Sequence, residues 1–262
     1  MFNFTHNLMR KFEFRLENFL NSFTAKTNYG AVAAIATPIV IIAGTCVVFY
    51  YAKHVFKSKN DGVFARSMSM GALHGGKLAM ERLTDYHQAR ADAASLNAAE
   101  SELKVLLEEE QPDFKKLQSA VAKLEMSGKE AVAVGILESA VKKARMEEKP
   151  QEAYEIEMLL VEMLIYKGDY DKALKCECLS HEEISDARRP LYKAIIHIML
   201  DSPKEEASKY WEEFTEVRTH FQSPPISQDD DQSHQAITNF NEFGKVVDQV
   251  LKKDITKAHT KR

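Results

Sequence analysis

The stretch from Thr27 to Ala52 contains no charged side chain, and this feature constrains the chain more than any other. A helix needs about 20 predominantly apolar residues to cross the hydrocarbon core of a bilayer, so this stretch is long enough. Tyr29 lies near one end and Tyr51 near the other, where amphipathic rings prefer the headgroup level. Residues 27–52 are therefore predicted to form a transmembrane helix, and the alternative is a buried core helix.

Residues 1–26, which precede this span, have a helical pattern of their own. Apolar side chains recur at helical spacing from Leu8 through Leu16 to Phe23, with basic residues between them. Such a pattern is typical of an amphipathic helix that lies on a membrane surface. A cleaved secretory signal is disfavoured because the apolar run is too long and starts too late, whereas an organellar targeting peptide is an alternative.

The charges that flank the span predict its orientation. Lys53, Lys57 and Lys59 follow it closely, while few basic residues lie just before it. By the positive-inside rule, the larger C-terminal part lies in the cytosol or in an equivalent space such as a stroma. We therefore expect a single-pass protein of an organelle membrane.

The rest of the chain is predicted to be all-α. Ten glycines and seven prolines in 262 residues favour long helices over many short strands. The net charge of −4 provides no basic field for nucleic acid, and three cysteines are too few for a disulfide framework. The predicted organisation is an amphipathic N-terminal segment at 1–26, a transmembrane helix at 27–52, a basic juxtamembrane linker at 53–76, a helical domain at 77–225, a disordered linker at 226–236, and an amphipathic C-terminal helix with a basic tail at 237–262.

Two helical hairpins in the predicted domain repeat each other. "AYEIEMLLVEMLIY", "KGDYD" and "KALKCECL" match "PLYKAIIHIML", "DSPKE" and "EASKYWEEF". Ala173 and Ala207 are 34 residues apart, and the same shift takes Val161 to Ile195. A small residue at this place lets two helices cross closely. A period of 34 residues is that of the tetratricopeptide repeat.

Residues 154–221 resemble tetratricopeptide (TPR) repeats, and "YKGDYDKAL" is the strongest match. The chain departs from the family pattern at Glu157 and Leu191, where an aromatic residue is usual. The resemblance implies an all-α fold in which the N-terminal transmembrane helix is followed by a TPR-like α-hairpin array, an α-α superhelix. An anchor joined to such repeats is also similar to TPR-like proteins of plant organelles, which favours the chloroplast over the mitochondrion.

The resemblance implies that a protein partner binds in a concave groove lined by the first helix of each pair. The family's groove positions fall on Glu155, Glu162, Tyr166, Arg189 and Tyr192. The function expected from this is a membrane-tethered scaffold or assembly factor for a membrane complex. The alternative is an organelle-surface receptor or co-chaperone tether for precursor proteins. A chaperone-tail clamp would place several basic residues in the groove, whereas Arg189 is the main one here.

The stretch "CECLSH" offers Cys176, Cys178 and His181 as possible metal ligands. If residues 172–179 form the second helix of a repeat, the two cysteines point about 200° apart and cannot share an ion. Ser180 and Glu183 are then a capping box that opens another short helix. A structural zinc site also needs four ligands. We therefore predict packing cysteines and no metal.

The stretch "GALHGGK", from Gly71 to Lys77, has the spacing of a phosphate-binding loop. It lacks a hydrophobic strand before it, and Leu78 occupies the position of the magnesium-binding hydroxyl residue. Glu155 and Glu162 lie on one helical face, but no nucleophile or histidine pattern accompanies them. We predict that the chain is not an enzyme and uses no cofactor.

Apolar residues near the C-terminus recur at helical spacing, from Phe240 through Val247 to Leu251. A terminal amphipathic helix often covers the apolar face that the last repeat of an array exposes. The basic end of this helix makes docking on a membrane or on a partner the alternative.

Overall fold

The computed structural model describes residues 63–64, 66–91, 93–220 and 239–260. Within these residues all regular structure is helical, which confirms the predicted all-α class for this part of the chain. The predicted segments at 1–26, 27–52 and 226–236 lie outside the described residues. No helix of the described part is long and apolar enough to cross a bilayer.

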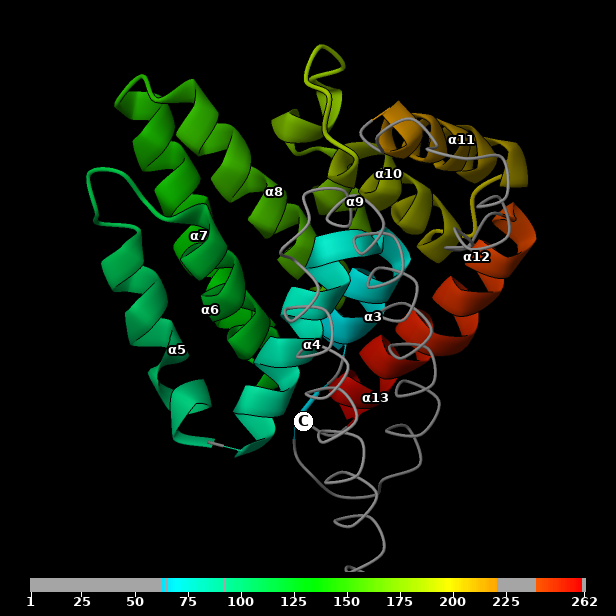
Figure 1. Cartoon of the computed structure of the whole chain (residues 1–262). Coiled ribbons are helices and arrows are strands. Elements are labelled where there is room, and N and C mark those ends of the chain that lie inside the picture. Colours follow the sequence, from blue (N-terminus) through cyan, green and yellow to red (C-terminus); the bar gives the residue numbers. More distant parts are fainter. Residues whose placement is uncertain (1–62, 65, 92, 221–238, 261–262) are drawn as a thin grey trace, which may run out of the picture.

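The helices follow one another across the domain, with α3 and α4 packed on one side of the row (Figure 1). In chain order they are α3 (Arg66–His74), α4 (Gly76–Ala91), α5 (Ala93–Leu106), α6 (Phe114–Met126), α7 (Glu130–Met146), α8 (Pro150–Lys167), α9 (Tyr170–Leu174), α10 (Arg188–Met199), α11 (Lys204–His220), α12 (Phe240–Val246) and α13 (Lys253–Thr260). A 3-10 turn at Glu177–Ser180 follows α9, and a π-helical segment at Val247–Lys252 joins α12 to α13.

Helix α8 is the centre of the domain. It begins at Pro150, whose fixed φ suits a first helical turn, and it ends at Gly168 with φ 86°, as a left-handed cap requires. Most of its side chains are buried on every side. Because α8 offers this much apolar surface, α7 packs mainly on α8 and only slightly on α6. Helices α6 and α7 follow one another in the chain, but the main partner of α7 is α8.

The second helix predicted over residues 172–179 is much shorter than expected. Helix α9 ends at Leu174, and the chain is extended at Cys176 before the 3-10 turn. Glu157 of α8 accepts a hydrogen bond from the backbone N–H of Cys178 at 2.8 Å, which holds this irregular segment against α8. The helix predicted to begin at Ser180 is absent too, because the hydroxyl of Ser180 donates back to the carbonyl of Glu177 and residues 181–187 form turns.

The linker predicted over residues 53–76 is helical from Arg66 onward, and the side chains of α3 from Arg66 to Leu73 are buried. A Cβ atom at Gly71 would lie 2.9 Å from Cγ of Arg82, so glycine is what lets α3 and α4 approach this closely. Gly75, with φ 77°, forms the turn between the two helices. The glycines of "GALHGGK" thus serve a helix–helix turn, and no strand precedes them in the described chain.

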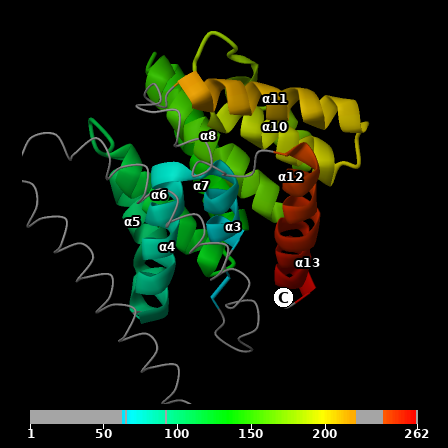
Figure 2. The ribbon, with the colours of Figure 1, turned by 45° about the vertical axis from the view of Figure 1, so that its right-hand side comes forward.

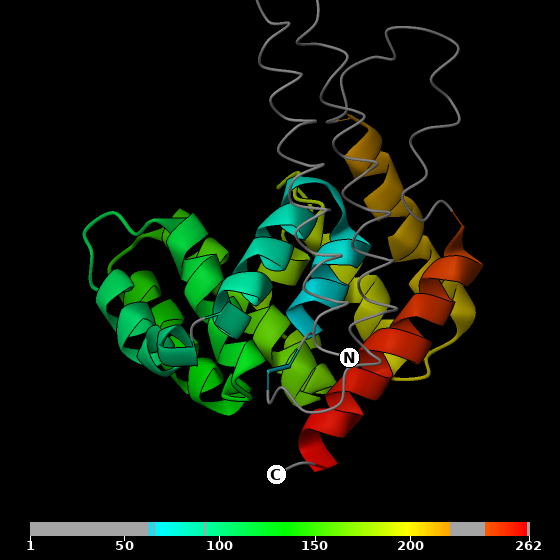
Figure 3. The ribbon, with the colours of Figure 1, turned by 60° about the horizontal axis from the view of Figure 1, so that its bottom comes forward.

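The C-terminal segment closes the domain. One apolar cluster runs from Met70 of α3 to Ile255 of α13. Phe243 of α12 stacks on Trp211 of α11 with ring centroids 4.3 Å apart. Figure 2 shows α10 and α11 side by side beyond α12, and Figure 3 shows α3 between the α6–α8 side and the C-terminal helix. The segment therefore covers α10 and α11, as predicted for a cap, and contacts α3 as well.

Candidate functional site

One face of α8 carries most of the residues expected to bind a partner. Glu155, Leu159, Glu162 and Tyr166 follow one another at helical spacing and lie on one face, which we call the inner face. This face divides into two parts. Glu162 and Tyr166 form its covered half, where α3 and α4 lie over it, and Glu155 and Leu159 form its open half.

The covered half is built on the carboxylate of Glu162. Arg82 of α4 donates to both of its oxygens at 3.0 Å, and the hydroxyls of Tyr166 and Tyr192 donate to the same two oxygens at 2.9 and 3.1 Å. These four side chains are at most 1% exposed. Arg82 also donates to the carbonyl of Gln118 at 2.9 Å. A buried carboxylate with four charge-assisted or hydroxyl donors is well satisfied.

The protonation states of this group follow from its burial. Burial raises the pKa of Tyr166 and of Tyr192 well above the ordinary value, and the neighbouring Glu162 carboxylate raises both further. Burial alone would lower the pKa of Arg82, but the charge of Glu162 and the smaller contributions of Tyr166, Tyr192 and Asp85 together raise it. Both tyrosines are therefore neutral donors at physiological pH, and the guanidinium is charged.

A second arginine joins α3 to the same region. Arg66 donates from Nε to Glu125 at 2.7 Å, from Nη2 to Glu130 at 3.2 Å, and from Nη1 to the backbone carbonyl of Tyr166 at 3.1 Å. Arg66, Glu125 and Glu130 are fully buried. Each helix of the α3–α4 hairpin thus places one arginine against the C-terminal half of α8.

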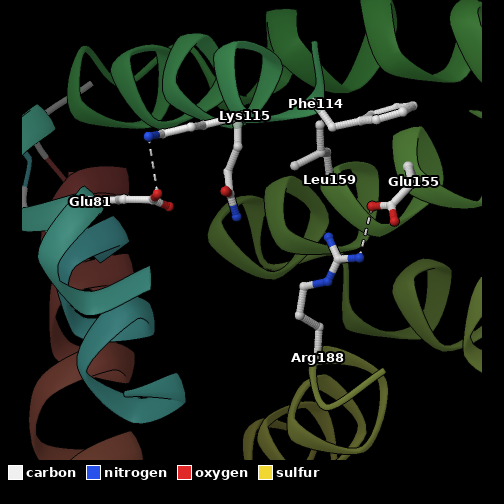
Figure 4. Close-up of a pocket in the computed structure, with 7 residues that line it drawn as sticks. Glu81, Phe114, Lys115, Glu155, Leu159 and Arg188 are labelled. Carbon is white, nitrogen blue, oxygen red and sulfur yellow. Dashed lines mark hydrogen bonds and ion pairs between the residues drawn. The ribbon is translucent and has the colours of Figure 1, made fainter. Parts of the chain in front are cut away.

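The open half lines a cavity of about 200 Å³ between α4, α6, α8 and the start of α10 (Figure 4). Phe114 and Leu159 lie close together in it as an apolar wall. Two ion pairs stand at its edges. Lys115 is 3.4 Å from Glu81, and Arg188 is 2.8 Å from Glu155.

Two further hollows adjoin this cavity. One of about 540 Å³ follows α4 and α6 and shares Glu81, Lys115 and Gln118 with it. The other, of about 590 Å³, lies between the start of α8 and the loop at 181–187, and it shares Glu155 and Arg188 with the cavity. We call the three together the open groove. Because neighbouring hollows share lining residues, the three lie side by side along α4, α6 and α8.

Carboxylates outnumber guanidinium groups at the end of the groove near α10. Glu155, Glu183 and Asp186 line this end together with one arginine, Arg188. Arg188 donates to Asp186 and to Glu155, and the hydroxyl of Tyr154 donates to Asp186 at 3.2 Å. Burial opposes ionisation of Asp186, but the hydrogen bonds and charge of Arg188 lower its pKa below the ordinary value. This end of the groove therefore has a net negative charge at neutral pH.

The structure corrects the predicted groove residues. Glu155 lines the open groove. Glu162, Tyr166 and Tyr192 are brought together, but they are buried beneath α4 instead of facing a partner. Arg189 is also buried, and it pairs with Glu213 of α11. Those four side chains, two on α8 and two on α10, lie in the interior because other helices of the same chain cover them.

Several residues of the site were not found from the sequence. Leu159 lies one turn after Glu155, so the helical period alone could have indicated it. Arg188 precedes the predicted Arg189 by one residue, and only the start of α10 decides which of the two faces the groove. The sequence did not indicate a role for Arg66 or Arg82. Arg66 lay in the predicted linker, and no sequence pattern predicted that α4 packs on α8.

Cys176 and Cys178 pack against the apolar core. Cys178 is buried, and burial raises the pKa of its thiol far above the ordinary value; burial also raises the pKa of Cys176, to about 12. Both are therefore thiols at neutral pH. In the part of the chain that the structure describes, no group of three or more His, Cys, Asp or Glu side chains could hold a metal ion.

Comparison with protein-family models, with curated proteins and with solved structures finds no match for this chain. The resemblance of residues 154–221 to TPR repeats therefore stays a prediction from the sequence.

Proposed function

We propose that this chain is a membrane-tethered, non-enzymatic scaffold or assembly factor for a membrane complex, built as a TPR-like array of helical hairpins. The observation that carries the proposal is the open groove. It combines an apolar wall, Phe114 and Leu159, with charged groups at its edges. An apolar centre within a polar rim is the composition of protein-binding surfaces.

The shape of the groove favours a polypeptide as ligand. Its three hollows of about 540, 200 and 590 Å³ lie side by side along the surface and are lined by residues of several helices. A segment of another chain fits such a row of hollows better than a compact metabolite, which usually binds in one enclosed pocket.

The predicted span at 27–52 supports the tether. Thirteen residues, Lys53 to Ala65, separate it from α3. Even a fully extended chain of this length reaches at most about 45 Å. The groove would therefore meet proteins embedded in or bound to the same membrane. An organelle membrane, with the chloroplast favoured over the mitochondrion, is part of this proposal.

The charge of the groove favours a scaffold over a receptor or co-chaperone tether. A clamp for an acidic chaperone tail requires several basic side chains. The end of this groove near α10 has the opposite character, with Glu155, Glu183 and Asp186 around Arg188.

Proximity labelling in intact cells tests the proposal. A labelling enzyme is fused to the C-terminus, and the wild type is compared with Phe114→Ala combined with Lys115→Glu. We expect the wild type to label one defined membrane complex and the groove variant to lose that labelling, because the apolar wall and the edge charge are changed.

The matched control is Val105→Ala with Lys104→Glu, the same kind of substitution on α5. Val105 is 65% exposed and the Lys104 side chain is 57% exposed, away from the groove. This control should label like the wild type. Equal labelling by the groove variant would refute the groove assignment, and recovery of chaperones with many unrelated precursors would favour the receptor.

The tether has its own test. Val40→Arg with Ile41→Arg places two charges in the middle of the predicted span, where each costs about 2.5–3.5 kcal/mol on insertion scales. We expect this variant to move from the membrane to the soluble fraction. Continued retention at the membrane would contradict the predicted span.

A further inference from the structure

The chain already shows how one segment binds the inner face of α8. Helix α4 contributes Leu78 and Arg82, four residues apart, which are 8% and 1% exposed. Arg82 donates hydrogen bonds to both oxygens of the Glu162 carboxylate. Leu78 lines the hollow that adjoins the central cavity. On the covered half, α4 thus binds the carboxylate of α8 through an arginine, and a buried leucine precedes that arginine by one turn.

The open half repeats the same chemistry on the same helix without such an occupant. Glu155 precedes Glu162 by seven residues, which is two helical turns or about 10.5 Å along α8. Leu159 and Phe114 provide an apolar wall beside it. The side chain of Glu155 is 27% exposed, whereas that of Glu162 is fully buried. A carboxylate next to an apolar wall is thus open to a second segment.

The negative charge at this end of the groove favours a bound segment that carries positive charge. Arg188 bridges Glu155 and Asp186, and Glu183, whose side chain is 70% exposed, lies at the rim of the same hollow. Arg188 thus pairs with two of the three carboxylates, and Oε1 of Glu183 lies 2.6 Å from Nδ1 of His181. Tyr154 also lines this hollow, and its hydroxyl donates to Asp186. A cationic side chain entering here would offset the surplus negative charge, and an anionic one would be repelled.

We propose that the partner of the open groove is a basic helical segment of another polypeptide, with a large apolar residue one turn before an arginine. The apolar residue packs on Phe114 and Leu159, and the arginine pairs with the partly exposed carboxylate of Glu155 and the exposed carboxylate of Glu183. This inference rests on the proposed protein-binding function and specifies the partner's chemistry.

Fluorescent helical peptides test the inference on the full chain in detergent micelles. One alanine-based peptide of about 15 residues carries Leu and Arg four residues apart, twice. A second peptide has Glu in place of each Arg, and a third has Ala in place of each Leu. We expect the Leu–Arg peptide to bind at least tenfold more tightly than either of the others by fluorescence anisotropy. Its affinity should fall as salt is raised, because the charges at the rim are exposed.

Variants of the groove locate the binding. Glu155→Gln with Glu183→Gln should weaken binding of the Leu–Arg peptide about tenfold and remove most of its salt dependence. The matched control is Glu109→Gln with Glu110→Gln, two exposed carboxylates after α5, which should bind like the wild type. Circular dichroism of each variant shows that the fold is kept, which is expected because the substituted carboxylates are partly exposed.

Three results would overturn the inference: equal binding of the Glu peptide, no binding of any peptide, or an unchanged affinity in the Glu155→Gln, Glu183→Gln variant. The proposed function can fail separately. If the groove variant loses its complex in proximity labelling but the Leu–Arg peptide does not bind, the scaffold stands and the partner's chemistry is wrong. If labelling is unaffected by the groove variant as well, the groove itself is not the binding surface.

Discussion

Glu155 and Glu162 are the same residue type on the same face of α8, two turns apart, yet their surroundings differ completely. Glu162 is fully buried and accepts hydrogen bonds from Arg82, Tyr166 and Tyr192. Glu155 is partly exposed and pairs with Arg188 at the rim of a groove. The difference comes from α4, which lies over one position and leaves the other open. A helical pattern in the sequence thus indicates which residues share one face of a helix, but it does not indicate which other segment covers that face.

The covered and open halves of the inner face are therefore expected to have different roles. Removing one partner of a buried ion pair leaves an uncompensated charge and typically costs about 3–5 kcal/mol. An exposed pair contributes about 0–1 kcal/mol, because water and salt screen it. The covered half should stabilise the fold, and the open half should be free to bind.

Glu162→Gln is expected to have the largest effect. The amide keeps the size of the side chain but leaves the charge of buried Arg82 uncompensated, so we expect the free energy of unfolding to fall by about 3 kcal/mol or more. Urea unfolding followed by circular dichroism measures it. A loss below about 1 kcal/mol would show that water reaches Arg82, contrary to its 1% exposure.

Asp254 of α13 extends the covered region to the C-terminal helix. It is 8% exposed, one of its carboxylate oxygens has no hydrogen-bond partner among the described residues, and burial raises its pKa to about 6. Lys257 on the same helix and Arg66 of α3 oppose this shift, and Glu125 of α6 adds to it.

The sign of the pH dependence follows from that raised pKa. The folded state holds the Asp254 proton up to about pH 6, whereas the unfolded chain releases it near the ordinary value of 3.8. Stability from this group is therefore present at low pH and lost as pH rises through about 6. Asp254→Asn should raise the free energy of unfolding by roughly 2–3 kcal/mol at pH 8 and by little at pH 4. Parallel urea curves at both pH values test this, and an equal change at both would refute it.

Gly71→Ala tests how closely the α3–α4 hairpin is packed. The new Cβ would lie 2.9 Å from Cγ and 3.0 Å from Cβ of Arg82, and neither atom is the free end of a flexible side chain. Overpacking of this kind costs about 1–3 kcal/mol, which outweighs the helix propensity gained from alanine. The urea midpoint should fall. Gly135→Ala on α7, where a Cβ would meet nothing within 4 Å, is the matched control and should leave the protein unchanged or slightly more stable.

The parts of the fold that depend on local pattern could be predicted from the sequence. Gly168 caps α8 with a positive φ, a conformation that glycine at a helix end favours, and Ala173 and Ala207 are both buried. Val161 and Ile195, related by the same shift, are fully buried as well. These positions follow from the helical period and from the conformational freedom of glycine. Both depend only on residues that are close in the sequence.

The parts that depend on distant residues could not be predicted. The segment at 66–76 has glycines and serines and a weak period, yet it is buried because Arg66 meets two carboxylates that lie 59 and 64 residues further along the chain. Helical spacing places Glu155, Glu162 and Tyr166 on one face of α8, and Glu162 is buried there because Arg82, 80 residues earlier, covers it. Such long-range ion pairs have no sequence period that could indicate them.

Glu155→Gln is expected to have the smallest effect on stability and to complete the comparison. The change is the same as at Glu162, on the same face of the same helix, but Arg188 keeps its bonds to Asp186, so no buried charge is left uncompensated. We expect the free energy of unfolding to change by about 0.5 kcal/mol or less in the same urea experiment. A loss as large as that of Glu162→Gln would mean that the groove carboxylate is a structural ion pair. In that case the open half would resemble the covered half, and the argument that it is free to bind a partner would lose its physical basis.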